Sequence, residues 1–258
     1  MPSAQATLTL IGGPTLLIEI DGYRLLTDPT FDAPGPYPSD SIVLEKRAGP
    51  AMSPDSIGRI DAVLLSHDQH ADNLDPAGRE YLARAPVVLT TRVGAERLGN
   101  GAVGLAPWQE FALERDGAEP LLVTGAPARH GPAGVEPIAG EVTGFLLGAR
   151  EPGDLVYVTG DTVWYDGVAE VARRFKPRLV VPFAGSAKTR GAFHLTMDAN
   201  DVIETAAAFP TAWLAPIHTD GWAHFSETGD ELSRALETFK LGSRLVRLAP
   251  GVATAVAL

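Results

Sequence analysis

A series of short apolar runs, each bounded by turn-forming residues, constrains the fold of this chain more than any other feature. Three β-rich runs, at residues 7–11, 15–20 and 23–27, are separated by "GGP" and "DG" and predict a meander of hairpins. Continuous apolar runs, typical of strands buried on both faces, follow at residues 61–66, 86–91, 121–125, 142–148, 154–160, 178–185, 211–218 and 244–250. These runs predict β-sheets at the centre of the fold.

Helical periodicity occurs between some of these strands. Apolar residues recur with the spacing i, i+3, i+4 and i+7 at Val168, Val171, Ala172 and Phe175, and again at Leu232, Ala235, Leu236 and Phe239. A third helix is predicted over residues 198–209, with Thr196 as its N-cap and Pro210 just after its end. Because a helix that is apolar on one face packs against a sheet, we expect an α/β fold of two packed sheets with helices on the outer faces. We expect one domain over residues 1–258.

Composition limits the functions that the chain can carry. It has no cysteine among its 258 residues, so any metal must be held by His, Asp, Glu or Asn side chains. The formal net charge of −11 is opposite to that of a typical nucleic-acid-binding surface. The stretch "MPSAQATLTLIGG" lacks the basic flank and apolar core of a signal peptide, and no apolar run is long enough to span a membrane. We therefore expect a soluble, cytoplasmic protein that acts on a small molecule, with neither nucleic acid nor a membrane as partner.

All the histidines lie at the end of a predicted strand or in the loop after one. The six are His67, His70, His130, His194, His218 and His224. A single histidine in a loop is most often only a solvated polar residue. Ligands and catalytic groups, however, collect at strand ends, because a rigid sheet holds them while the loops let them converge. The ordered series of histidines and aspartates therefore favours a functional site.

Six segments, taken in their order along the chain, resemble segments of the metallo-β-lactamase superfamily. The resemblance is to the branch that includes L-ascorbate-6-phosphate lactonase and N-acyl-phosphatidylethanolamine phospholipase D. "LLSHDQHADNLD" is similar to the His-X-His-X-Asp-His signature, "APARHGP" to the segment with a single His ligand, "TGDT" to the segment with a bridging Asp, and "APIHTDGW" to the last ligand segment. "TLLIEIDGYRLLTDPTF" resembles the opening hairpin, and "FHLTMDANDVIETA" resembles the entry to a helix. The resemblance covers nearly the whole chain and implies an αββα sandwich with a metal site at the edge of its two sheets.

The resemblance also implies the ligands of that site. The matching residues are His67, His70 and His130 for the first metal, Asp72 and His218 for the second, and Asp161 as the bridge. They would hold one or two divalent ions, most often zinc, and leave a position open for water. The metal would lower the pKa of that water to about 7 and polarise the substrate. Asp72 would also orient the nucleophile, and His194 is a candidate substrate contact or general acid.

The first ligand segment departs from the signature. The chain reads His67-Asp68-Gln69-His70-Ala71-Asp72-Asn73, so only a one-residue insertion keeps both histidines and Asp72 in place, and Asn73 then replaces a histidine. An amide oxygen is a harder and weaker ligand than an imidazole, so the second site should be weaker, absent, or filled by a harder ion such as manganese. Asp68 is an alternative ligand. Asp28 is a candidate to hydrogen-bond to the ligands without contacting the metal. His224 is expected either to lie near the pocket or to have a structural role.

Two classes of function remain open. The first is a metal-dependent hydrolase that uses a metal-bound hydroxide to cleave an ester, lactone or phosphodiester bond of a small molecule. The second is a non-catalytic metal-binding or sensor module on the same fold, which the altered signature keeps open. An iron-dependent oxidoreductase is a third reading. The segment 28–54, rich in Pro, Gly and Ser, is predicted to be a long irregular loop that contributes to the substrate pocket.

Overall fold

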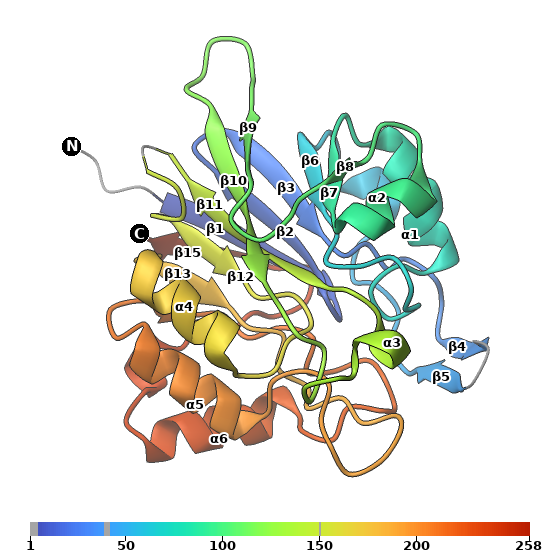
Figure 1. Ribbon diagram of the computed structural model, residues 1–258, viewed down its shortest axis with the longest axis vertical. Coiled ribbons are helices and arrows are strands. Elements are labelled where there is room, and N and C mark those ends of the chain that lie inside the picture. The colour runs from blue at the N-terminus through green and yellow to red at the C-terminus, as the bar shows by residue number, and fades with distance from the viewer. Residues whose placement is uncertain (1–4, 39–41, 150) are drawn as a thin grey trace.

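Two β-sheets form the centre of the computed structural model, which describes residues 5–38, 42–149 and 151–258 (Figure 1). The first sheet has the strand order β15-β1-β2-β3-β6-β7-β8. Its strands are β1 (Gln5–Gly12), β2 (Thr15–Ile20), β3 (Tyr23–Thr27), β6 (Ala62–Leu64), β7 (Val88–Thr90), β8 (Val103–Gly104) and β15 (Ala253–Ala257). Strands β1 to β3 form an antiparallel meander, whereas β3, β6, β7 and β8 run parallel.

The second sheet has the order β14-β13-β12-β11-β10-β9. Its strands are β9 (Glu110–Leu113), β10 (Leu121–Pro127), β11 (Thr143–Gly148), β12 (Val156–Val158), β13 (Leu179–Val181) and β14 (Trp213–Leu214). Side chains from both sheets, such as Leu25 and Phe145, are fully buried in one shared core. A separate hairpin pairs β4 (Gly35–Pro38) with β5 (Val43–Lys46).

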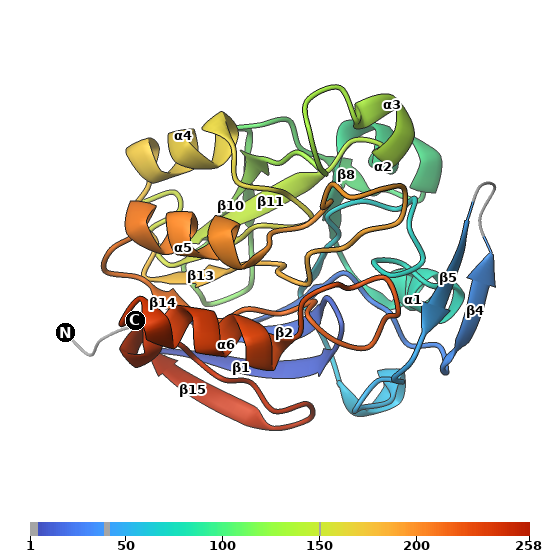
Figure 2. The same ribbon diagram turned by 90° about the horizontal axis from the view of Figure 1, so that it is seen from below.

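Helices cover the outer faces of the two sheets (Figure 2). On the first sheet lie α1 (Pro76–Tyr81) and α2 (Arg92–Leu98), and on the second lie α4 (Asp166–Arg174), α5 (Ala199–Ala208) and α6 (Gly229–Thr238). The short helix α3 (Glu136–Ala139) and the 3-10 turns η1 (Pro54–Ser56), η2 (Leu82–Arg84) and η3 (Gly242–Arg244) lie in connecting segments. The predicted αββα sandwich is confirmed. Within the described ranges, no helix is long and apolar enough to cross a bilayer.

Most predicted strands are confirmed, but three local predictions are wrong. The run at 244–250 forms no strand, because β14 is only two residues long and pairs with this run through a single bridge at Leu245. The segment 28–54 is not wholly irregular, since it contains the β4–β5 hairpin. The N-cap of α5 is Asp198, whose carboxylate accepts from Asp201 N–H, whereas the Thr196 hydroxyl accepts from Ala187 N–H.

The two predicted apolar stripes are confirmed, except at Phe239. Phe175 and Phe239 are the C-cap residues that follow α4 and α6, and Phe239 is 60% exposed. Phe175 still packs against the cluster that contains Val168 and Val171, so only the stripe of α6 ends with its last helical turn.

Candidate metal centre

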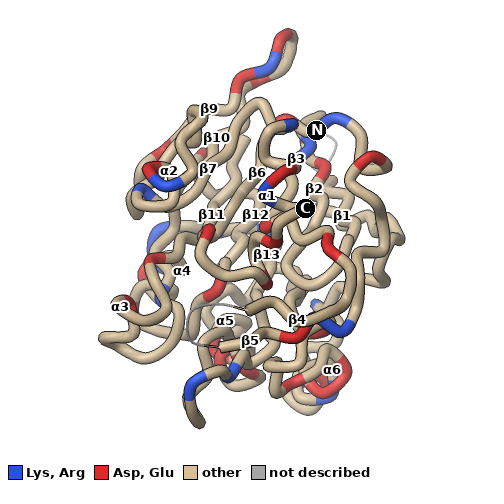
Figure 3. Tube along the Cα trace, turned by 90° about the vertical axis from the view of Figure 1, so that its right-hand side faces the viewer, with Lys and Arg blue, Asp and Glu red and all other residues tan. Residues whose placement is uncertain are grey.

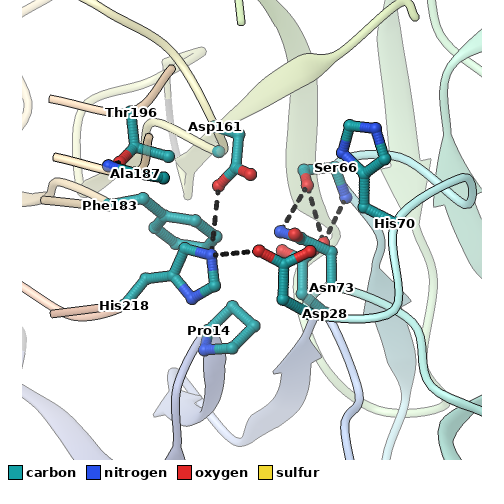
Figure 4. Close-up of polar contacts among 12 residues, drawn as sticks. Pro14, Asp28, Ser66, His70, Asn73, Asp161, Phe183, Ala187, Thr196 and His218 are labelled. Atoms are coloured by element: carbon teal, nitrogen blue, oxygen red, sulfur yellow. Dashed lines mark hydrogen bonds and ion pairs between the residues drawn. The ribbon is translucent and has the colours of Figure 1, made fainter. Parts of the chain in front are cut away.

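The ends of five strands from both sheets converge at one edge of the sandwich (Figure 4). The residues that follow β3, β6, β10, β12 and β14 include Asp28, Ser66, His67, His130, Asp161 and His218, all of them buried. Asp28 and His218 have φ angles of 29° and 57°, in the left-handed region that non-glycine residues seldom adopt. Such conformations cluster at functional sites, where the surrounding structure holds them in place.

His67, His70 and His130 bring three ring nitrogens together. His67 Nε2 lies 2.8 Å from His70 Nδ1, and His130 Nε2 lies 3.2 Å from the same atom. Burial is the largest cause that lowers the pKa of all three rings, to about 4 for His70 and for His130. The three imidazoles are therefore neutral at neutral pH and direct nitrogens at a common point.

Asp72, Asp161 and His218 form an adjoining cluster. His218 Nε2 lies 3.6 Å from Asp72 Oδ2 and 3.6 Å from Asp161 Oδ1. The other oxygen, Asp161 Oδ2, faces the first cluster, at 3.6 Å from His130 Nε2 and 4.0 Å from His67 Nε2. Asp161 thus lies between the two clusters, the position that a bridging carboxylate requires.

The two carboxylates of this cluster titrate differently. Burial raises the pKa of Asp161 to about 6. Burial acts in the same direction on Asp72, but hydrogen bonds and positive charge from His218 and His224 outweigh it and hold the pKa of Asp72 well below its ordinary value. Asp72 is therefore the carboxylate that stays ionised over the wider pH range.

Hydrogen bonds behind the rings set their tautomers. Ser66 Oγ donates to Asp28 Oδ1 over 2.7 Å (Figure 4). The same oxygen lies 2.9 Å from His67 Nδ1. Because the hydroxyl proton is directed at Asp28, His67 Nδ1 carries a proton and donates it to Ser66. His130 Nδ1 donates in the same way to the Leu195 carbonyl oxygen over 2.8 Å. His67 and His130 therefore both present a lone pair on Nε2, as metal-binding histidines do.

The donor set fits a divalent cation. Both oxygens of Asp161 and both ring nitrogens of His218 are buried and have no hydrogen-bond partner among the described residues, which is costly unless something else satisfies them. Ligand atoms at about 2.1 Å from a tetrahedral ion lie about 3.4 Å apart. The separations within and between the two clusters, 2.8 to 4.0 Å, lie around that value.

Asp68 and Asn73, the other candidates in this segment, have different partners. The Asp68 carboxylate pairs with Arg97 of α2, whose Nε lies 3.0 Å from Oδ2, so the structure does not bring it to the cluster. The Asn73 Nδ2 is 3.5 Å from Ser66 Oγ (Figure 4), and its Oδ1 is buried without a hydrogen-bond partner among the described residues. The register with one added residue is thus the one in which His67, His70 and Asp72 converge.

His194 and His224 lie in different places. His194 Nε2 is 3.0 Å from Asp201 Oδ2 and its Nδ1 is 3.7 Å from Asp198 Oδ2, at the start of α5. The hydrogen bond with Asp201 raises the pKa of His194. The structure therefore places His194 in an ion-pair cluster apart from the ligands. His224 Nε2, in contrast, lies 2.9 Å from Asp72 Oδ2.

Sequence reasoning missed Ser66, the Leu195 carbonyl and Arg97. A hydroxyl residue directly before the first histidine was the one available signal, for Ser66. The other two contacts join segments 65 and 29 residues apart, at His130–Leu195 and Asp68–Arg97.

A cavity of about 60 Å³ adjoins the first cluster and reaches Asp72. His70, Asp72 and His130 form part of its wall, and apolar side chains that include Leu44, Val135, Ile138 and Leu195 form much of the rest. A second cavity of about 470 Å³ reaches only His218 among the predicted ligands. The smaller cavity is the better candidate for the reacting group of a substrate, because it meets ligands of both clusters.

Comparisons with known proteins identify the family. The profile of a family described as Beta-lactamase superfamily domain matches residues 23–219. The chain belongs to this family. Among β-lactamase superfamily relatives, the UPF0173 protein YddR of Bacillus subtilis is 26% identical over 235 residues, which cover 87% of this chain and 90% of that protein. A UPF0173 metal-dependent hydrolase of Hyperthermus butylicus is 26% identical over 247 residues, covering 93% and 95%.

A solved structure shows the same β-lactamase superfamily fold. The isothiocyanate hydrolase from Delia radicum gut bacteria aligns with a TM-score of 0.80 and 23% identity, over 98% of this chain and 100% of that one. The superfamily expected from the sequence is confirmed.

Proposed function

We propose that this protein is a metal-dependent hydrolase that cleaves an ester, lactone or phosphodiester bond of a small molecule. The observation that carries the proposal is the pair of donor clusters that share Asp161 and adjoin one small cavity. A divalent ion bound there, zinc or manganese, lowers the pKa of water and polarises a substrate oxygen. One relative is named a metal-dependent hydrolase, which agrees with this reading. We place the chain in the branch with the lactonase and the phospholipase on the sequence resemblance alone.

The chain's own residues hold the reactants in place. Asp72 stays ionised, so its carboxylate accepts hydrogen bonds from a nucleophilic water and orients it. The apolar wall at Val135 and Leu195 excludes bulk water from the reacting bond. A cavity this small admits a short apolar group, well below the several hundred Å³ of pockets for drug-sized ligands.

The charge distribution agrees with a small-molecule substrate. In the view of Figure 3 the Lys and Arg positions are interleaved with Asp and Glu along the trace and form no continuous basic stripe. The excess of acidic over basic residues disfavours a polyanionic partner. The cytoplasmic location expected from the sequence stays a prediction.

The test is turnover by zinc- and manganese-loaded protein of short-chain p-nitrophenyl esters, small lactones, bis-p-nitrophenyl phosphate and allyl isothiocyanate. The isothiocyanate is included because a protein of the same fold is described as an isothiocyanate hydrolase. His130→Ala and Asp161→Asn are expected to lower turnover at least about 100-fold, because each removes a donor from the centre. Asp116→Asn, at an exposed position between β9 and β10, serves as the matched control.

The proposal would be contradicted if the metal-loaded wild-type protein turned over none of these compounds. If such protein still binds metal tightly, the non-catalytic metal-binding module becomes the better reading.

A further inference from the structure

His70 differs from the other two imidazoles of the first cluster, because no hydrogen bond behind its ring fixes it. His67 Nδ1 bonds to Ser66 Oγ over 2.9 Å. His130 Nδ1 bonds to the Leu195 carbonyl oxygen over 2.8 Å. Among the described residues, the His70 ring has only these two imidazoles as hydrogen-bond partners, both through its Nδ1. The placement of the His70 ring therefore depends on the backbone that carries it.

That backbone is held two residues before His70, at Asp68. The Asp68 side chain is only 4% exposed, and its carboxylate accepts two hydrogen bonds from Arg97 of α2, with Nε 3.0 Å from Oδ2 and Nη2 directed at Oδ1. The Asp68 carbonyl oxygen accepts from Nη2 of Arg79, in α1, over 2.9 Å. Gly94 lets α2 come this close, since a Cβ at that position would lie 3.2 Å from Asp68 Oδ1. Asp68 is thus attached to two helices, through its side chain and through its backbone.

This attachment accounts for the residue that the chain has in excess of the signature. Asp68 and Gln69 stand between the two histidines of the segment, where the signature has a single residue. Asp68 turns outwards to α2, and the chain returns at His70, whose carbonyl oxygen accepts from Asn73 N–H over 3.1 Å and from Leu74 N–H over 2.9 Å. The segment is therefore fixed on both sides of the His70 side chain.

A carboxylate beside the ligands has two possible roles, as a ligand or as an anchor for the loop. The contacts of Asp68 favour the anchor, because turning towards the cluster would break a buried, bidentate ion pair. We propose that Asp68 is a positioning residue, whose ion pair with Arg97 holds His70 in the first metal cluster. This inference rests on the metal centre of the proposed hydrolase but not on its reaction.

The test measures the zinc dissociation constant of the first cluster by competition with a chromogenic chelator. Asp68→Ala and Arg97→Ala should each weaken zinc binding about 10- to 100-fold, because either change removes the ion pair. The double variant should bind no more weakly than the weaker single variant, since both changes act through one contact. Arg92→Ala, at an exposed position of the same helix, is the matched control and should leave the constant unchanged.

Arg97→Ala separates the two roles of Asp68. If Asp68 is an anchor, this variant binds zinc more weakly than the wild-type protein. If Asp68 is a ligand, its freed carboxylate keeps the affinity equal to that of the wild type or raises it, and this result overturns the proposal. A double variant whose loss equals the product of the two single losses also overturns it, because the two residues would then act independently.

Two further measurements separate positioning of a ligand from a general weakening of the fold. The free energy of unfolding of each metal-free variant in urea shows that it is folded under the binding conditions. The visible absorption spectrum of the cobalt-loaded protein, which reports the ligand set and its geometry, should change in Asp68→Ala and in Arg97→Ala but not in Arg92→Ala. An unchanged spectrum in the first two variants overturns the proposal.

These outcomes are distinguishable from a failure of the proposed reaction, since no measurement here depends on turnover. Zinc binding with the expected losses but without hydrolysis would contradict the hydrolase and leave Asp68 as a positioning residue. Hydrolysis by a protein whose zinc affinity is unchanged in Asp68→Ala would contradict the Asp68 assignment alone.

Discussion

Ser66 illustrates how one side chain acts on a metal centre without being a ligand. Its hydroxyl accepts from His67 Nδ1 and donates to Asp28, whose Oδ1 also accepts Ser66 N–H over 2.9 Å. Burial raises the pKa of Asp28 well above its ordinary value, so a cation bound in front of His67 would help to keep this carboxylate ionised. The chain of three residues therefore couples the orientation of His67 to the charge of the site.

We predict that Ser66→Ala weakens zinc binding at the first cluster about 10- to 100-fold, because the Nδ1 proton of His67 loses its acceptor and the ring its orientation. Competition with a chromogenic chelator measures this dissociation constant. Ser56→Ala, at an exposed position in η1, is the matched control and should leave the constant unchanged. An unchanged affinity in Ser66→Ala would show that packing alone orients His67.

A buried ion pair is one of the contacts that attach the β4–β5 hairpin to the rest of the fold, beside its bridge from Lys46 to Trp222. Lys46, the last residue of β5, lies 2.9 Å from Asp75, and their side chains are 4% and 0% exposed. Asp75 also accepts from Phe31 N–H and from Gly78 N–H, so it caps α1 and holds the chain after β3. Through this pair the hairpin, which carries Leu44 in the cavity wall, is attached to the first sheet.

Lys46→Met should destabilise the protein by about 3 to 5 kcal/mol, because it leaves the Asp75 carboxylate buried without its cation. The free energy of unfolding in urea measures the loss. The exposed pair of Arg84 and Asp55 gives the comparison, since Arg84→Met should cost less than about 1 kcal/mol. Similar losses in the two variants would mean that Asp75 is stabilised mainly by its backbone N–H donors.

The packing of the two sheets holds the neutral imidazoles of His67 and His130 in buried positions, with His70 partly buried beside them. The folded-state pKa of His70 and of His130 is about 4, below the ordinary value of 6.5, and that of His67 is also well below it. Between pH 6.5 and 4 these three histidines therefore bind more protons in the unfolded chain than in the folded one, and their contribution to stability rises with pH. Asp161, whose pKa is raised from 3.8 to about 6, contributes in the opposite direction between those two values.

We predict that the metal-free protein is progressively destabilised as the pH falls from about 6.5 to about 4, by up to about 3 kcal/mol for His70 alone. Urea unfolding at steps of pH measures the slope. His70→Asn should reduce the slope, because one of the groups that the unfolded chain protonates is gone. If stability changed equally steeply with pH in both proteins, the loss of stability at low pH would be due to carboxylates and not to His70.

Local patterns predicted most of the elements, because a strand or an amphipathic helix depends on residues a few positions apart. The runs at 15–20 and 23–27 coincide with β2 and β3, and the periodic segment near Val168 with α4. The short strands at sheet edges, such as β8 and β15, were not predicted, since two to five residues of mixed exposure carry little pattern of their own. Whether such a segment is a strand depends on the partner that it meets.

The identity of the candidate ligands could be read from the chain, because their order along it resembles a known superfamily and each follows a strand. The contacts around these ligands could not be predicted from the chain. Asp68 meets Arg97 across 29 positions, and Asp72 meets His224 across 152. No local pattern encodes such distances, because they arise only when two sheets pack and bring loop ends together. The chain thus specifies which atoms can bind a metal, and the packing of the sandwich specifies which of them point at the same place.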